Sequence, residues 1–254
     1  MLRALAVGYA SGVRARARAP ARNGSRLSEE TMTATESLPA LEAVRRELEI
    51  DEQAPGGHPQ VRAVLTLTTN LDLAPAQLWP LLTRPEELEA WYGPVRGELH
   101  EGGRFTAPHG ASGTVLEVEE PHRLSLLWEQ IGEEDPLQIR LDPEDDGTTL
   151  LRLRHTVLVP RERFDRGGPG EVALGWELAL LALVAHTDGW RHGCLAEAPV
   201  PTREWMRGEE GRRYLRAWSV RWAAEAVAAG VDEGVARRVE AEALRSRLDS
   251  PQET

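Results

Sequence analysis

Lysine is absent from this chain of 254 residues, and all 30 of its basic residues are arginines. This absence excludes a Schiff-base lysine and a phosphate-binding loop that ends in lysine. Cysteine occurs once, as Cys194, so an intramolecular disulfide is excluded and a reducing compartment is indicated. We therefore expect a cytoplasmic protein that uses neither lysine chemistry nor disulfides.

Long apolar runs are also missing, and none approaches the roughly 20 consecutive apolar residues that a membrane-spanning helix needs. Positive charge is not in excess either, because 41 acidic residues outnumber 30 basic ones and give a net charge of -11. A nucleic-acid partner requires a basic face. The sequence also has no nucleophile elbow, phosphate loop or dinucleotide fingerprint. We expect no membrane span, no nucleic-acid partner and no cofactor.

The first 31 residues form a basic segment with six arginines and no acidic residue before Glu29. The apolar stretch in this segment, residues 5–10, is too short for a secretion signal. We predict that residues 1–37 are a disordered extension or lie upstream of the true start, for which Met32 is suited.

Removing residues 1–31 should change the melting temperature by less than about 5 °C, because the segment has no periodic apolar face to offset its ordering entropy. The measurement compares the full chain with a chain that starts at Met32. A larger drop would show that the segment packs on the rest of the protein.

The residues that follow show first a helical and then a strand-like periodicity. Leu41, Val44 and Leu48 lie at i, i+3 and i+7, so residues 38–50 are predicted to be a short helix, with a polar linker up to residue 59. Residues 61–70 alternate between apolar and polar side chains, which predicts a half-buried strand. Proline favours the first turn of a helix, so two short helices are expected from Pro75 and from Pro85.

Residues 95–159 consist of short alternating segments separated by glycine- and proline-containing turns, which predicts an antiparallel meander. Residues 171–186 carry an apolar helical stripe that a curved sheet could accommodate. A second stripe, which includes Trp218 and Trp222, predicts a helix over residues 209–229. Gly230 ends that helix and Asp232 can cap a last one, and this tail should pack on the domain because it is too polar to fold alone.

A series of residues in this order and spacing resembles the START-like (SRPBCC) superfamily, in the branch similar to the activator of the heat-shock-protein-90 ATPase. The series comprises Ala74-Pro75-Ala76-Gln77-Leu78-Trp79, Trp91-Tyr92-Gly93-Pro94, Gly102-Gly103-Arg104-Phe105, Ser112-Gly113, Pro121-His122-Arg123-Leu124, Trp128, Ile139-Arg140-Leu141, Gly147-Thr148-Thr149, His155 and Gly175-Trp176. The resemblance implies an α+β helix-grip fold over residues 60–190, in which a curved antiparallel sheet wraps a long helix and leaves a cavity between them. Residues 191–254 would then be a helical extension.

His155 is the first candidate for a site. On the strand of residues 151–159 it falls in register with the apolar side chains, so it points toward the core or the cavity. It could anchor a ligand, act as an acid or base near neutral pH, or be a core histidine satisfied by one hydrogen bond.

Six aromatic residues should surround the cavity if the implied fold holds. Such residues line small-molecule pockets, and they also fill cores. They are Trp79, Trp91, Tyr92, Phe105, Trp128 and Trp176. One group of metal-ligand types, His186, Asp188, His192 and Cys194, matches no standard zinc spacing, and we expect no metal site there.

We expect a START-like domain that binds a small hydrophobic molecule without chemistry of its own. The resemblance leaves two alternatives open. One is a chaperone-interacting module, and the other is a cyclase- or hydrolase-like enzyme that uses the same cavity. The absence of a recognisable acid/base pair lowers the weight of the enzyme alternative.

Overall fold

The computed structural model describes residues 39–54, 57–130, 132–168, 170–187, 189–190 and 198–249. The predictions for residues 1–37 and for Asp188, His192 and Cys194 lie outside these ranges. The strands are β1 (Val44–Gln53), β2 (Gln60–Leu71), β3 (Arg96–Gly97), β4 (Arg104–Thr106), β5 (Ser112–Glu119), β6 (Arg123–Gln130), β7 (Glu133–Pro143) and β8 (Thr149–Pro160). The helices are α1 (Pro39–Ala43), α2 (Pro75–Thr83), α3 (Pro85–Trp91), α4 (Arg161–Gly167), α5 (Gly170–His186), α6 (Arg203–Arg207), α7 (Glu209–Ala228) and α8 (Glu233–Asp249).

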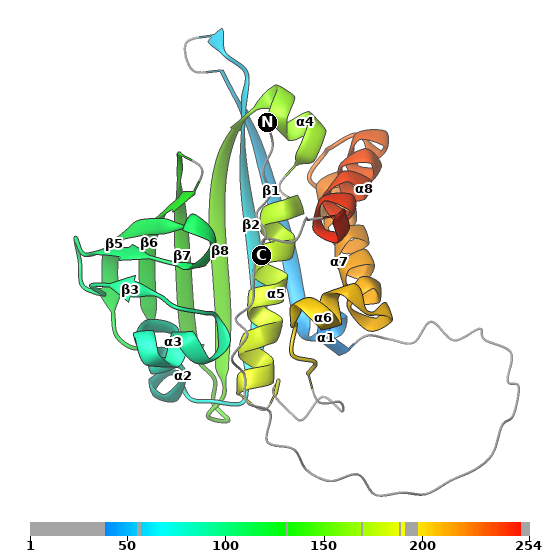
Figure 1. The fold of residues 1–254 in the computed structure, drawn as a ribbon. Helices are drawn as coiled ribbons and strands as arrows, with labels where there is room; N and C mark the ends of the chain where they lie inside the picture. Colours follow the sequence, from blue (N-terminus) through cyan, green and yellow to red (C-terminus); the bar gives the residue numbers. More distant parts are fainter. Residues whose placement is uncertain are drawn as a thin grey trace, which may run out of the picture.

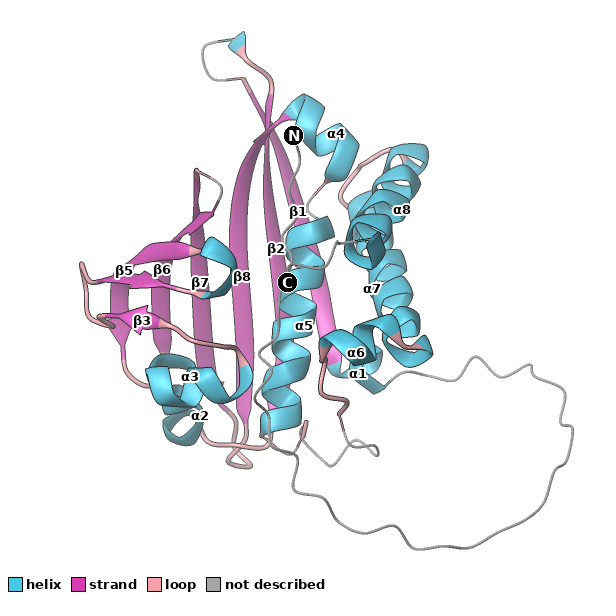
Figure 2. Ribbon diagram, viewed as in Figure 1, coloured by secondary structure: helices cyan, strands magenta, loops and turns pink. Residues whose placement is uncertain are grey.

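One eight-stranded antiparallel sheet curves around α5, as Figures 1 and 2 show. Its strand order is β1-β2-β8-β7-β6-β5-β4-β3, so the strands from β3 to β8 follow the chain as a meander. The pairing of β2 with β8 joins the two ends of this domain. The helix pair α2 and α3 covers one end of the sheet, and α7 and α8 lie beyond α5 (Figure 1). This is the α+β helix-grip arrangement that the sequence predicts.

The predicted helix over residues 38–50 is wrong for most of its length. Only residues 39–43 are helical, as α1, and Val44 begins the edge strand β1, which pairs with β2. Side chains at positions 44, 46 and 48 are buried while those between them are exposed. The buried residue at position 46 is an arginine, which does not count as apolar. The alternation of buried and exposed side chains is therefore not visible in the hydrophobicity pattern. The sheet therefore begins before residue 60.

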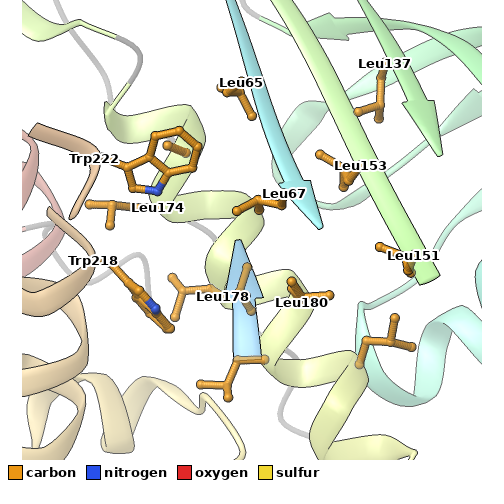
Figure 3. Packing of buried hydrophobic residues seen from close by; sticks show 14 of the residues in the cluster. Leu65, Leu67, Leu137, Leu151, Leu153, Leu174, Leu178, Leu180, Trp218 and Trp222 are labelled. Atoms are coloured by element: carbon orange, nitrogen blue, oxygen red, sulfur yellow. The ribbon is translucent and has the colours of Figure 1, made fainter. Parts of the chain in front are cut away.

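Helix α5 is buried on both sides, because the sheet covers one side and the C-terminal helices cover the other. The sequence predicts one apolar stripe, yet Leu174, Leu178 and Leu181 are as fully buried as Leu180 and Leu183. A helix that is apolar all round is the type that fills the centre of a protein. Figure 3 shows leucines of the sheet on one side of α5 and the tryptophans of α7 on the other.

The prediction that the C-terminal tail packs on the domain is confirmed for the described residues. Trp218 and Trp222 of α7 are 1% and 4% exposed and belong to the same core as the sheet leucines (Figure 3). Gly230 follows α7 with a φ of 95°, a conformation that glycine adopts without strain. The carboxylate of Asp232 accepts a hydrogen bond from the backbone N–H of Val235 at 3.1 Å and so caps α8.

A buried ion pair joins β1, α5 and α7. Arg46 binds Glu177 through two hydrogen bonds, Nε to Oε1 at 2.5 Å and Nη2 to Oε2 at 3.0 Å. The Nη1 group of Arg46 donates to the carbonyl oxygens of Leu41 and Val44, and Nε1 of Trp222 donates to Glu177 Oε1 at 3.0 Å. Burial raises the pKa of the Glu177 carboxyl, and the charge of Arg46 opposes that rise. This network ties the tail to the sheet.

Among the described residues, no single helix has the length and apolar character to cross a membrane. Helix α4 and residues 172–186 pass that test only as a pair bent by 55°, and only by length and composition. Most of α5 is core in this fold, and core helices pass the same test.

Candidate functional site

Aromatic side chains meet on the concave face of the sheet, under α5. Cross-strand register aligns Phe105 of β4 with Gly113 of β5, and Gly113 with Trp128 of β6. The ring centroids of Phe105 and Trp128 are 5.9 Å apart, and those of Trp128 and Trp176 are 5.5 Å apart. The ring centroids of His155 and Trp176 are 5.8 Å apart. These four residues, Phe105, Trp128, Trp176 and His155, are called the aromatic cluster below.

Gly113 is the position that lets the aromatic cluster form. A Cβ at this residue would lie 2.3 Å from the carbonyl oxygen of Leu127 and 2.6 Å from Cζ of Phe105. Both distances are shorter than real carbon contacts, so a larger residue would force the strand or the Phe105 ring to move. The glycine of the Ser112-Gly113 pair is therefore required by the close approach of Leu127 and Phe105 to this position.

His155 is buried on β8, as its register predicts, with 3% of its surface exposed. Its Nδ1 accepts a hydrogen bond from Nε1 of Trp176 at 2.9 Å. The Trp176 N–H can only donate, so the proton of the neutral imidazole is on Nε2. Among the described residues, Nε2 has no hydrogen-bond partner. The prediction of a core histidine satisfied by one hydrogen bond therefore holds for Nδ1, whereas the Nε2–H group lacks an acceptor among the described residues.

Asp135 of β7 lies next to His155, and the sequence analysis did not single it out. Its Oδ2 is 3.9 Å from Nε2 of His155, and it is the direct cross-strand partner of Trp128. Burial raises the pKa of the Asp135 carboxyl to about 6, and burial lowers the pKa of His155 to about 4. At pH 7 the pair is therefore a neutral imidazole facing a carboxylate.

These two pKa shifts predict opposite effects of acid on stability. Unfolded His155 takes up a proton below its ordinary pKa of 6.5 and the folded form only below about 4, so acidification through this window favours unfolding by up to about 3 kcal/mol. For Asp135 the folded form takes up its proton first, between about pH 6 and its ordinary pKa of 3.8, which favours folding. Asp135→Asn should therefore lose stability more steeply than the wild type between pH 6.5 and 4.

Urea denaturation midpoints at four pH values from 4 to 7 measure this effect. His155→Gln provides the matched comparison, because its amide oxygen can still accept the Trp176 N–H without titrating. We expect this variant to lose less stability on acidification than the wild type. Parallel profiles for the wild type and both variants would refute the assignment of these two groups.

The remaining predicted aromatics lie on α2, on α3 and directly after α3, rather than in the aromatic cluster. Trp91 and Tyr92 form a pair with centroids 5.5 Å apart, and Nε1 of Trp91 donates to the carbonyl oxygen of Leu81 at 2.9 Å. This bond fastens α3 to α2, so it indicates a packing role for Trp91. Trp79 of α2 is buried and borders a pocket between α2 and the sheet.

That pocket has a volume of about 290 Å³ and lies on the same sheet face as the aromatic cluster. Trp79 and Thr83 of α2 line it on one side and Val118 and Leu124 on the other. A second cavity of about 30 Å³ lies between α5 and the C-terminal helices, where Leu174 and Trp222 contribute to its wall. The sequence predicts an apolar pocket beneath α5, and neither of these two cavities lies there.

A comparison with known protein families matches the part of the chain from α2 to α5. The family model described as "Activator of Hsp90 ATPase homolog 1-like protein" matches residues 72–188. The solution structure of CalU16 from Micromonospora echinospora is 29% identical, with 74% of this chain and 97% of that chain covered and a TM-score of 0.54. The crystal structure of CalU16 is 31% identical over 56% of this chain and 83% of that chain, with a TM-score of 0.46. No curated protein sequence matches the chain.

A third structure, PFC0360w, is described as an HSP90 activator from Plasmodium falciparum. It is 19% identical, with 36% of this chain and 71% of that chain covered and a TM-score of 0.34, so it says nothing about partners of this chain. The family model and CalU16 agree with the sheet, the wrapped helix and the residue series on which the resemblance rests. The chain belongs to the activator of Hsp90 ATPase homolog 1-like family of START-like (SRPBCC) proteins.

Proposed function

We propose that this START-like domain binds a small, mainly hydrophobic molecule on the concave face of its sheet and does not transform it. The aromatic cluster carries this proposal, because its rings follow one another across the contact between the sheet and α5. These rings contact one another in tilted or edge-to-face geometry, so a flat apolar molecule stacks on a ring face by replacing one of these contacts. Ligand sites are mostly apolar and aromatic with a few polar groups, and His155 and Asp135 are such groups here.

The pocket beside α2 supports the proposal because it lies on the same sheet face as the aromatic cluster. Leu124 borders this pocket, and Leu124, Leu126 and Trp128 lie on the same face of β6. Leu126 lies between Leu124 and Trp128 on this face and is 7% exposed, so a ligand that enters at Leu124 must displace it to reach Trp128. The pocket volume of about 290 Å³ is close to the lower limit of roughly 300 Å³ for small-molecule sites.

Equilibrium dialysis against 2-methoxynaphthalene, a flat apolar probe, tests the proposal. We expect a dissociation constant on the order of 10 µM for a probe of this size. Trp128→Leu should weaken binding at least about fivefold, because it removes the indole from the centre of the aromatic cluster. Trp205→Leu is the matched control, because Trp205 lies on α6 and contacts Tyr214 rather than the aromatic cluster. Retention of the probe that is absent, or unchanged by Trp128→Leu, would contradict the proposal.

The description of the matched family model favours a second candidate, a module that interacts with the chaperone Hsp90. This candidate predicts that adding the protein raises the ATPase rate of Hsp90, whether or not the probe is present. The enzyme alternative predicts a chemical change in a bound molecule, since Asp135 and His155 are the acid and base types that catalysis uses. Under our proposal the Hsp90 ATPase rate stays unchanged and mass spectrometry recovers the probe intact.

A further inference from the structure

The N–H of His155 Nε2 is a donor without an acceptor in the most buried part of the aromatic cluster. Its residue is 3% exposed, and no acceptor lies within hydrogen-bond distance among the described residues. A buried donor without a partner costs about 1 to 3 kcal/mol. Folded proteins keep few such groups, and each one that persists calls for an explanation such as a bound molecule.

The nearest acceptor is the carboxylate of Asp135, and it is too far away. The separation of 3.9 Å between His155 Nε2 and Asp135 Oδ2 exceeds the roughly 3.2 Å limit of a good hydrogen bond. A single oxygen atom placed about 2.8 Å from both would join them at an angle of about 90°. That oxygen must accept from the imidazole N–H and donate to the carboxylate. A hydroxyl group does both, whereas a carbonyl or an ether oxygen only accepts.

The surroundings of this gap define what the hydroxyl is attached to. Asp135 pairs directly with Trp128 across β6 and β7, and His155 is bonded to Trp176. A molecule whose oxygen sits in the gap therefore has indole rings beside its carbon skeleton, which favours a flat aromatic ring. The Asp135 side chain is 19% exposed, whereas Nε2 of His155 is closed to solvent. A ligand oxygen therefore reaches the gap only when neighbouring side chains move.

The charge of Asp135 suits the acceptor role. The backbone N–H of Leu158 donates to its carboxylate and so orients it. Glu133 raises the pKa of this carboxyl and Arg163 lowers it, and these two residues bind each other at 3.4 Å. With a pKa of about 6, the carboxylate is ionised at pH 7.5, and a hydroxyl donates more strongly to an ionised acceptor.

We propose that His155 and Asp135 bind the hydroxyl group of a phenol-type ligand, in which the hydroxyl is attached directly to a flat aromatic ring. This proposal rests on the proposed function, because it assigns a ligand class to the same concave face. His155 Nε2–H donates to the hydroxyl oxygen, and Asp135 accepts its hydrogen. The ring stacks in the aromatic cluster, so recognition combines one polar bridge with an apolar surface.

Equilibrium dialysis of the full chain at pH 7.5 with two matched probes tests this inference. The probes are 2-naphthol, which can accept and donate, and 2-methoxynaphthalene, which can only accept. We expect 2-naphthol to bind about 10-fold more tightly, the value of one charge-assisted hydrogen bond. Asp135→Ala should abolish this ratio by weakening 2-naphthol alone. Asp142→Ala is the control on the same strand, because Asp142 pairs with Arg140 on the other face, and it should keep the ratio.

Each result decides between the two proposals. Equal affinity of the wild type for both probes overturns the hydroxyl bridge and leaves the proposed function in place. Retention of neither probe overturns both proposals. Loss of the ratio in Asp135→Ala, with unchanged affinity for 2-methoxynaphthalene and unchanged circular dichroism, supports the bridge. Equal weakening of both probes in Asp135→Ala counts against it, because the side chain would then act only on the shape of the site.

Discussion

Replacing Arg46 by methionine is expected to lower the free energy of unfolding by about 3 to 5 kcal/mol. The substitution leaves the Glu177 carboxylate, whose side chain is 1% exposed, without its partner in the core. It also frees the carbonyl oxygens of Leu41 and Val44, which Arg46 now binds. Urea denaturation followed by circular dichroism measures the loss.

The neighbouring residue on the same strand provides a matched control. Arg45 faces solvent, with its side chain 66% exposed, and pairs with Glu47. Exposed pairs contribute about 0 to 1 kcal/mol, so Arg45→Met should change stability by less than 1 kcal/mol. Adding Glu177→Leu to Arg46→Met should recover much of the loss, because no charge then remains buried. Equal costs for Arg45→Met and Arg46→Met would show that the buried pair does not hold β1 to α5.

Replacing Trp222 by alanine is expected to cost about 3 to 5 kcal/mol, the usual loss for a large core aromatic. Trp222 is 4% exposed, and its indole N–H donates to Glu177 at 3.0 Å, so the change removes both packing and a hydrogen bond. Trp218→Ala should have a similar effect, because Trp218 is 1% exposed. Denaturant midpoints give the loss, and sedimentation should show an unchanged mass because both side chains are buried within one chain.

Two further variants separate packing from hydrogen bonding on α7. Trp222→Phe keeps a six-membered ring but removes the indole nitrogen and two ring carbons. We expect about 1 to 3 kcal/mol from the lost hydrogen bond to Glu177 and a packing loss smaller than that of Trp222→Ala. Val220→Ala is the surface control on the same helix, because Val220 is 45% exposed, and it should stay within about 0.5 kcal/mol of the wild type. A change of mass without loss of stability would instead identify α7 as an interface between chains.

Local sequence patterns determined most of the elements of this fold. The alternation in residues 61–70 and 151–159 gave β2 and β8, and prolines at 75 and 85 marked the starts of α2 and α3. The burial of His155 followed from its register with Leu151 and Leu153 on one strand. These predictions held because neighbours along the chain decide secondary structure and side-chain direction.

Patterns failed where a charged side chain is buried. Arg46 interrupts the apolar alternation of β1, so the pattern predicts a helix where the structure has a strand. Glu177 lies outside the predicted apolar stripe of α5, so the pattern does not indicate that it is buried or that it pairs with Arg46. The two residues are 131 positions apart in the sequence. A single sequence shows which residues are charged but not which of them form ion pairs. The desolvation cost of burying a charged side chain is offset only when such a partner is present.

The candidate site divides in the same way. The sequence by itself determined the family, the aromatic residues and the inward direction of His155, because these depend on residue type and strand period. The tertiary structure alone decided that Asp135 faces His155, that Trp176 fixes its tautomer, and that Trp91 and Tyr92 lie apart from the aromatic cluster. Those relations arise from strand pairing and from the docking of α5 on the sheet, which bring together side chains that are distant in the chain.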